Sequence, residues 1–263
     1  MGLSSAQFAR SAALEADQAR LQRLASMGDA ELRALLGGDL ARAAAWIASA
    51  AECGVVDAQL CLGRMLLAGQ GVACDAAVAL RWFERAAAQG SAAAWNMIGR
   101  CQEHGWGLAA DTAAAAHSYR RSAEAGHDWG QYNLGNLLFD GRGLACDQPA
   151  ALRWYLQAAQ QGHARAMNLV GRCLEEGWGC AARPGEAAYW YRRSAESGYF
   201  RGQFNHALAL LEAGQLEPAT QWLRRAALGG DAAMRRAILA RIDHQRAAPL
   251  AALAAQIRAI GAL

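Results

Sequence analysis

The chain has 263 residues, 54% of them hydrophobic and only four of them proline, and its formal net charge is +3. A chain rich in alanine and leucine with so few prolines favours helix throughout and excludes a fold of strands punctuated by turns. The small and evenly spread charge excludes the basic surface of a nucleic-acid-binding protein. All 26 basic residues are arginine, a bias that GC-rich bacterial coding explains better than selection for phosphate binding.

The N-terminal part, residues 1–54, is expected to form capping helices with a degenerate repeat that ends in Trp46 and Ile47. Met1 to Arg20 hold no continuous apolar run that would serve as a signal peptide, and no later stretch reaches the length of a membrane span. We therefore expect a cytoplasmic protein with no membrane partner.

Residues 55–198 are predicted to form four repeats of 36 residues, because glycines recur at that spacing in several registers. Two of these registers are Gly63, Gly99, Gly135 and Gly171, and Gly71, Gly107, Gly143 and Gly179. The first register lies within a first helix, helix A, where a glycine lets a neighbouring helix approach closely. The turn Gly69-Gln70-Gly71 then ends helix A.

A second helix, helix B, is predicted to follow each turn. The residues that recur where an N-cap would begin it are Asp75, Asp111 and Asp147. Arg183 takes that position in the fourth repeat, with Pro184 in the first helical turn. Trp82 and Phe83 represent aromatic positions of helix B that are expected to face inward. One hairpin cannot bury that face alone, so stacking of the repeats is expected to supply the core.

The array is expected to end in a shortened fifth repeat at residues 199–230, followed by capping helices at residues 231–263 that are split near Pro249. All of these parts are predicted to form one continuous solenoid domain. A period of 72 residues overlies the period of 36, since Gly99-Arg100-Cys101 matches Gly171-Arg172-Cys173. We infer that a block of two repeats was duplicated.

The full motif is visible in the third repeat. It comprises Tyr132-Asn133-Leu134-Gly135, Gly141-Arg142-Gly143-Leu144, Asp147, and Trp154-Tyr155 through Ala158-Ala159 to Gly162. This combination resembles a Sel1-like repeat, a relative of the tetratricopeptide repeat. The resemblance implies an all-α fold, a right-handed α-α superhelix (solenoid) of about five helix-hairpin repeats. It also implies that the A helices line a concave surface that holds a partner, as in bacterial and eukaryotic adaptor proteins.

A candidate binding face follows from the repeat. Positions −3, +1 and +4 relative to the glycine of helix A share one helical stripe. In tetratricopeptide relatives the −3 and +1 positions line the ligand groove, and Arg100, Asn136 and Arg172 are similar to an arrangement that clamps a peptide carboxylate. A guanidinium binds a carboxylate through two parallel hydrogen bonds, and aromatic neighbours can anchor an extended or helical peptide. The predicted partner-binding residues are Arg64, Asn96, Arg100, Tyr132, Asn136, Phe139, Asn168 and Arg172.

Two other interpretations of this region stay open. Arg100 can pair with Glu103 along its own helix, as can the corresponding residues of the fourth repeat, which would make the stripe a solvated surface. Trp106 and Trp178 lie in Gly-x-Gly loops, where they can form a second contact site or pack over the next repeat.

No catalytic or metal-binding motif is found in the sequence. The six histidines form no HExxH motif, and the Gly-x-Gly turns lack the strand that precedes a phosphate-binding loop. We therefore predict no catalytic residue, metal or cofactor, and expect the seven cysteines, Cys53 and Cys61 among them, to stay reduced. The sequence predicts a monomeric scaffold or adaptor for a protein or peptide partner. The alternatives are an obligate subunit that positions a partner enzyme and, behind both, an enzyme.

Overall fold

The computed structural model describes residues 40–243 and 247–260, in which every regular element is an α-helix. The capping helices predicted before Leu40 lie outside the described residues. The helices are α3 (Leu40–Glu52), α4 (Val56–Ala68), α5 (Ala76–Ala88), α6 (Ala92–His104), α7 (Thr112–Glu124), α8 (Asp128–Asp140), α9 (Gln148–Gln160), α10 (Ala164–Glu176), α11 (Pro184–Glu196), α12 (Phe200–Glu212), α13 (Leu216–Gly229), α14 (Ala232–Ile242) and α15 (Ala248–Ile260). The all-α repeat fold is therefore confirmed. None of these described helices is both long and apolar enough to cross a membrane.

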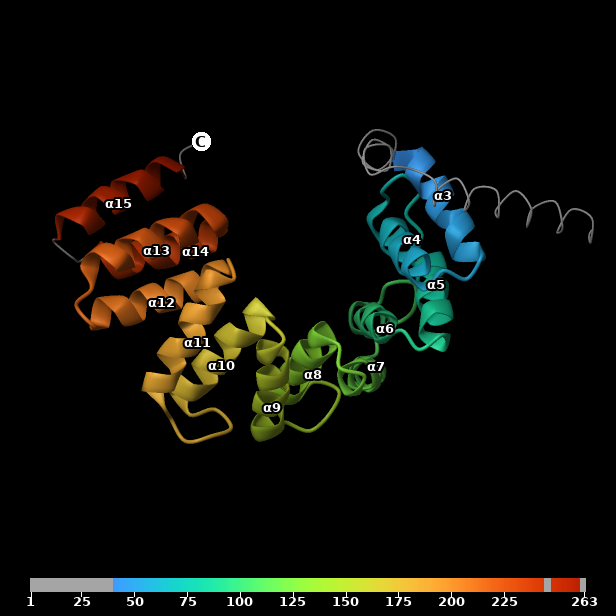
Figure 1. Cartoon of the computed structure of the whole chain (residues 1–263), viewed down its shortest axis with the longest axis horizontal. Helices are drawn as coiled ribbons and strands as arrows, with labels where there is room; N and C mark the ends of the chain where they lie inside the picture. Colours follow the sequence, from blue (N-terminus) through green and yellow to red (C-terminus); the bar gives the residue numbers. More distant parts are fainter. Residues whose placement is uncertain (1–39, 244–246, 261–263) are drawn as a thin grey trace, which may run out of the picture. The chain divides into compact units, whose positions relative to one another are not determined.

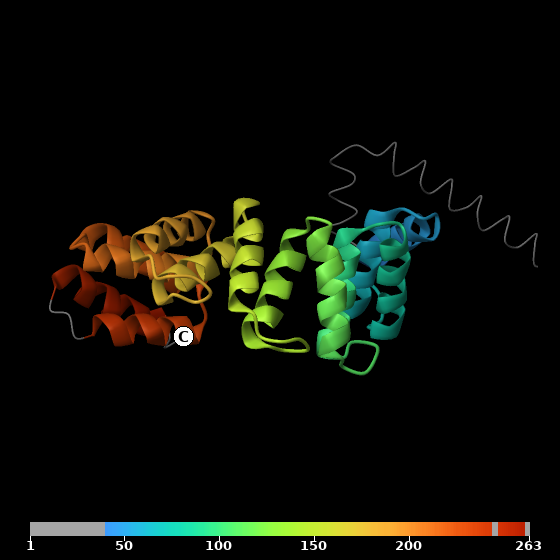
Figure 2. The ribbon, with the colours of Figure 1, turned by 90° about the horizontal axis from the view of Figure 1, so that it is seen from below.

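The described residues form two compact units, unit 1 at residues 40–130 and unit 2 at residues 131–243 and 247–260. In unit 1 consecutive helices from α3 to α7 pack against each other, as Figure 1 shows in blue and green. In unit 2 the same holds from α9 to α13, and α15 packs on α13 and α14 in both views (Figure 2). Pro249 lies in the first turn of α15, where its fixed φ suits the start of a helix.

Helices α4, α6, α8, α10 and α12 are the A helices, and each ladder glycine of an A helix faces an aromatic ring of the helix B that follows. The four pairs are Gly63 with Phe83, Gly99 with Tyr119, Gly135 with Tyr155, and Gly171 with Tyr191. A Cβ on Gly99 would lie 2.6 Å from Tyr119 Cδ1, so the ring packs directly on the backbone of helix A. The predicted close approach is present, and its partner is the aromatic residue that follows the tryptophan position.

The Gly-x-Gly turns have a second role beyond ending helix A. Gly105 and Gly107 have φ of +72° and +78°, a region that favours glycine. A Cβ on Gly107 would lie 2.5 Å from the carbonyl oxygen of Ala76, the first residue of α5. Gly179 meets the first residue of α9, Gln148, in the same way. Each of these turns therefore rests on the helix B of the preceding repeat.

The helix B starts follow the predicted capping pattern. Asp75 Oδ1 accepts from the Val78 backbone N–H at 2.9 Å, and Asp111 and Asp147 cap α7 and α9 in the same way. Arg183 makes no cap bond to α11 and instead pairs with Glu186 at 3.1 Å, while Pro184 occupies the first turn. The fourth repeat therefore lacks the side-chain cap that the first three repeats have.

All seven cysteines lie in the described residues as free thiols. Cys53 is exposed and Cys61 is half-buried. Cys101 and Cys173 are buried in helix A, and this burial raises the pKa of Cys101 to about 11 and that of Cys173 to about 12. Both buried thiols are therefore protonated at neutral pH and pack as small apolar groups.

Replacing a ladder glycine should destabilise the chain. In Gly99→Ala the new Cβ would collide with the ring of Tyr119, and we expect the free energy of unfolding to fall by about 1–3 kcal/mol, the usual cost of overpacking. The higher helix propensity of alanine offsets only about 1 kcal/mol of the collision. Urea denaturation followed by circular dichroism measures the difference.

Gly185 offers a matched control, because it also lies in a helix and nothing stands within 4 Å of where its Cβ would be. Gly185→Ala is therefore expected to leave the stability unchanged or raise it by up to about 1 kcal/mol. Equal stability of the two variants would contradict the role of the Gly99 contact.

Restoring the missing cap should stabilise the fourth repeat. Arg183→Asp is expected to raise the free energy of unfolding by about 1 kcal/mol, because an Asp side chain at the N-cap accepts a hydrogen bond from a backbone N–H of the first helical turn. The exposed ion pair with Glu186 that is lost contributes only about 0.3–0.5 kcal/mol. Thermal unfolding of Arg183→Asp and Arg183→Asn checks this, since asparagine caps a helix without adding charge. If both variants are less stable than the wild type, an N-cap side chain does not stabilise α11.

Candidate functional site

Two hollows open between the A helices α4 and α6 of unit 1. The larger has a volume of about 420 Å³ and is lined by Arg64, Leu67, Ala68, Cys74, Ala76, Met97, Arg100 and Trp106. The smaller has a volume of about 200 Å³ and is lined by Leu60, Arg64, Ala93, Asn96, Met97, Arg100, His127 and Trp129. Because the hollows share Arg64, Met97 and Arg100, we treat them as one groove, the unit 1 groove. It contains all three partner-binding residues predicted in unit 1.

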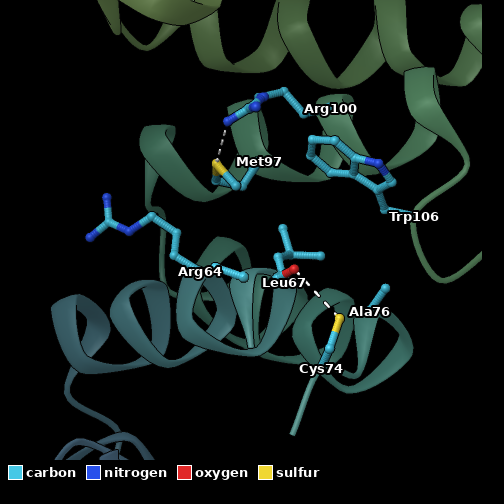
Figure 3. Close-up of a pocket in the computed structure, with 8 residues that line it drawn as sticks. Arg64, Leu67, Cys74, Ala76, Met97, Arg100 and Trp106 are labelled. Atoms are coloured by element: carbon cyan, nitrogen blue, oxygen red, sulfur yellow. Dashed lines mark hydrogen bonds between the residues drawn. The ribbon is translucent and has the colours of Figure 1, made fainter. Parts of the chain in front are cut away.

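The position of Arg100 in the groove is fixed by its neighbours. Figure 3 shows its guanidinium directed toward Met97, with Nη1 3.8 Å from Sδ, while Arg64 and Trp106 lie on opposite sides of the larger hollow. The Arg100 Cζ atom also lies 5.1 Å from the centre of the Trp106 ring, and that ring contacts the tilted ring of His104 with centres 4.8 Å apart. A guanidinium held beside an aromatic ring and a thioether is positioned to bind a carboxylate next to an apolar side chain.

In unit 2 a third hollow, of about 200 Å³, opens beside α10 and α12; we call it the unit 2 pocket. Its lining residues are Tyr132, Arg165, Asn168, Leu169, Arg172, Tyr199, Arg201, Phe204, Asn205 and Met234. Three predicted residues, Tyr132, Asn168 and Arg172, meet there. Asn168 Oδ1 accepts from Asn205 Nδ2 at 2.8 Å, and the Tyr132 ring stacks on His163 at 4.8 Å.

The other two predicted residues of unit 2 contact their own array instead of a described hollow. Asn136 Oδ1 accepts from the Tyr155 hydroxyl at 2.9 Å. Phe139 packs edge-on against Trp178, with ring centres 5.2 Å apart. The structure therefore does not bring Asn136 and Phe139 together with the unit 2 pocket, and their role in partner binding stays a prediction.

The glutamates of the stripe bond to tyrosines. The Tyr119 hydroxyl donates to Glu103 at 2.7 Å, and the Tyr191 hydroxyl donates to Glu175 at 2.6 Å. Burial, with the hydrogen bond to Glu175, raises the pKa of Tyr191, so this hydroxyl stays a donor. Within the described residues no ion pair joins Arg100 to Glu103, and none joins Arg172 to Glu175. The arginines of the stripe instead line the hollows.

The loop tryptophans pack backward along the array. Trp106 lines the unit 1 groove beside Leu67 and packs against the core of the preceding repeat. Trp178 contacts Phe139 of the preceding repeat and lies under Arg172, whose Cζ is 4.8 Å from the ring centre. The sequence left open that these tryptophans pack over the next repeat. They pack over the preceding repeat instead, because the Gly-x-Gly turn that holds each of them rests on the preceding helix B.

Several lining residues were not among the predicted binding residues. Met97 lies one position after the stripe, and Trp129, 41% exposed, starts the next helix A. In the unit 2 pocket Leu169 and Arg201 hold the corresponding places, and Arg165 takes the place of Ala93. The sequence features that could have identified them are a tryptophan and two arginines near the starts of A helices, at positions where the other repeats have different residues. Among the described residues, no group of three or more His, Cys, Asp or Glu side chains is placed to hold a metal ion.

Comparison with known proteins gives one family and several related structures. The Sel1 repeat model matches residues 23–55, 56–91, 92–127, 130–163, 164–199 and 202–231. It thus extends to the degenerate unit before the first clear repeat and to the shortened unit after the fourth. No curated protein matches the sequence.

The crystal structure of a protective antigen from uropathogenic Escherichia coli strains, which displays an SLR fold, is 31% identical with a TM-score of 0.67. The similarity covers 83% of this chain and 48% of that one, so the chain spans about half the length of the antigen. A Sel1 repeat protein from Oxalobacter formigenes is 28% identical with a TM-score of 0.64, over 71% of this chain and 76% of that one. With six matched repeats along most of its length, the chain belongs to the Sel1 repeat family.

Proposed function

We propose that the chain is a protein-interaction scaffold that binds a segment of a partner protein in the unit 1 groove. The observation that carries this proposal is the continuity of the two hollows through Arg64, Met97 and Arg100. A groove that follows two A helices suits an extended segment with several side chains in contact. Repeat arrays commonly use such surfaces to hold partners.

The chemistry of the groove specifies the kind of segment. The larger hollow, at about 420 Å³, has apolar walls that include Leu67, Met97 and Trp106, which suit a large aliphatic or aromatic side chain as an anchor. No acidic residue lines either hollow, while Arg64 and Arg100 lie where the hollows meet. The partner segment should therefore carry a carboxylate next to its apolar anchor, from Asp, Glu or a chain terminus.

Selection of a random peptide library against the full chain tests this proposal. We expect the enriched peptides to combine an apolar residue with a neighbouring carboxylate. Fluorescence anisotropy with a selected peptide should then show about tenfold or greater loss of affinity in Arg64→Ala/Arg100→Ala, because each charge-assisted hydrogen bond contributes about 1.5–3 kcal/mol.

The matched control is Arg81→Ala/Arg120→Ala, which removes the same charge from exposed positions on the B helices of unit 1. Circular dichroism should show equal helicity for all three proteins. If the enriched peptides lack acidic groups, or if both double variants bind them like the wild type, the unit 1 groove is not the binding site.

A further inference from the structure

The unit 2 pocket is the 72-residue counterpart of the smaller hollow in unit 1. The corresponding lining residues are Leu60 and Tyr132, Ala93 and Arg165, Asn96 and Asn168, Met97 and Leu169, Arg100 and Arg172, His127 and Tyr199, and Trp129 and Arg201. The Asn–Arg pair is kept in both copies, whereas an alanine and a tryptophan of the first copy are arginines in the second. The two copies therefore present different surfaces around the same pair.

The changes make the unit 2 pocket strongly basic. Three arginines line it, and no aspartate or glutamate does. Arg172 lies over the Trp178 ring and Arg201 over the Phe200 ring, with Cζ 5.8 Å from that ring centre. Neither of these two arginines forms an ion pair with another described residue. Cation–π contact with these aromatic rings positions the two guanidinium groups without neutralising them.

Neutral donors complete the lining. Asn168 is 4% exposed and uses its Oδ1 to accept from Asn205, so its Nδ2 group is left to donate. Burial raises the pKa of Tyr199, although the charges of Arg201 and Arg165 oppose the rise, and the phenol keeps its proton. The pocket thus combines guanidinium, amide and phenol donors around a volume of about 200 Å³.

We propose that the unit 2 pocket binds the phosphate group of a phosphate monoester. A carboxylate carries one charge and two oxygens, whereas a phosphate monoester carries about −1.5 to −2 at neutral pH and presents three acceptor oxygens. Three arginines in a lining that contains no acidic residue match the larger charge. The volume lies below the about 300–1,000 Å³ of pockets that enclose drug-sized ligands, so the pocket holds the phosphate group and leaves the esterified moiety outside. This inference is independent of the unit 1 groove.

Calorimetric titration of the full chain with ethyl phosphate and ethyl sulfate, at equal ionic strength and about pH 8, tests the proposal, because the two esters share a shape and differ by one charge. Ethyl phosphate is expected to bind about tenfold tighter or more, as the additional charge-assisted hydrogen bonds require. Lowering the pH through about 6 should remove the preference, because the phosphate then becomes a monoanion.

Two arginine variants localise the binding. Arg201→Gln should weaken ethyl phosphate binding about tenfold. Arg224→Gln, at an exposed position of α13 in the same unit that does not line the pocket, should bind like the wild type. Equal affinity for phosphate and sulfate in the wild type, or undiminished phosphate binding by Arg201→Gln, would overturn the proposal.

The same titration with a phosphoserine peptide and its unphosphorylated form distinguishes a phosphorylated protein from a small phosphate ester as the natural ligand. Tighter binding of the phosphopeptide than of ethyl phosphate assigns the pocket to a phosphorylated partner protein. Equal or weaker binding assigns it to a small phosphate ester. Both results support the phosphate site, and in either case Arg201→Gln must bind both ligands more weakly than the wild type.

Discussion

Contact between an aromatic ring and the bare backbone of a glycine sets the spacing of the four helix hairpins that contain a ladder glycine. With no Cβ at Gly99, the Tyr119 ring packs directly on the backbone of helix A, and the same pairing recurs with Phe83, Tyr155 and Tyr191. The close approach brings the tyrosine hydroxyls within reach of the polar stripe. Tyr119 and Tyr191 bond to the stripe glutamates, and Tyr155 bonds to Asn136. The stripe arginines are consequently left to line the hollows, so one packing constraint connects the core to the candidate site.

The Gly-x-Gly turns carry the second constraint, because their positive φ and their contact with the preceding helix B admit no larger residue in those places. The turn that ends α6 places Trp106 over the preceding repeat and beside Arg100. A side chain that would be mobile on a free loop therefore becomes a wall of the groove. Loops held in this way commonly contribute to binding on repeat scaffolds.

The two copies of the duplicated block differ around their hollows and share several packing contacts. Both copies keep the glycine–aromatic contact, the Glu–Tyr bond and the Asn–Arg pair. The first copy surrounds that pair with Ala93 and Trp129, and the second surrounds it with Arg165 and Arg201. Over the described residues, unit 1 contains seven arginines and eight acidic residues, whereas unit 2 contains 14 and 10. The small net charge of the whole chain therefore conceals a difference between the two units, because unit 2 is more basic than unit 1.

The sequence by itself determined the helix hairpins, the aspartate caps and the close approach at the ladder glycines. These features depend on local spacing and on the conformational range of glycine and proline. Because the same residues recur in successive repeats, they can be recognised in the sequence. It also assigned the residues of the predicted binding stripe to one face of helix A, since helical periodicity fixes which positions share a face.

The tertiary structure alone decided which members of the stripe meet. Asn136 bonds within the array, although it holds the same repeat position as Arg100 and Arg172, and Phe139 packs within the array as well. The hollows also depend on Met97, Trp129 and Arg201, whose contributions come from a neighbouring helix or the next repeat. Periodicity assigns a residue to a face, but the distance between adjacent helices and the rotamer of each side chain follow from packing across repeats, which no single repeat encodes.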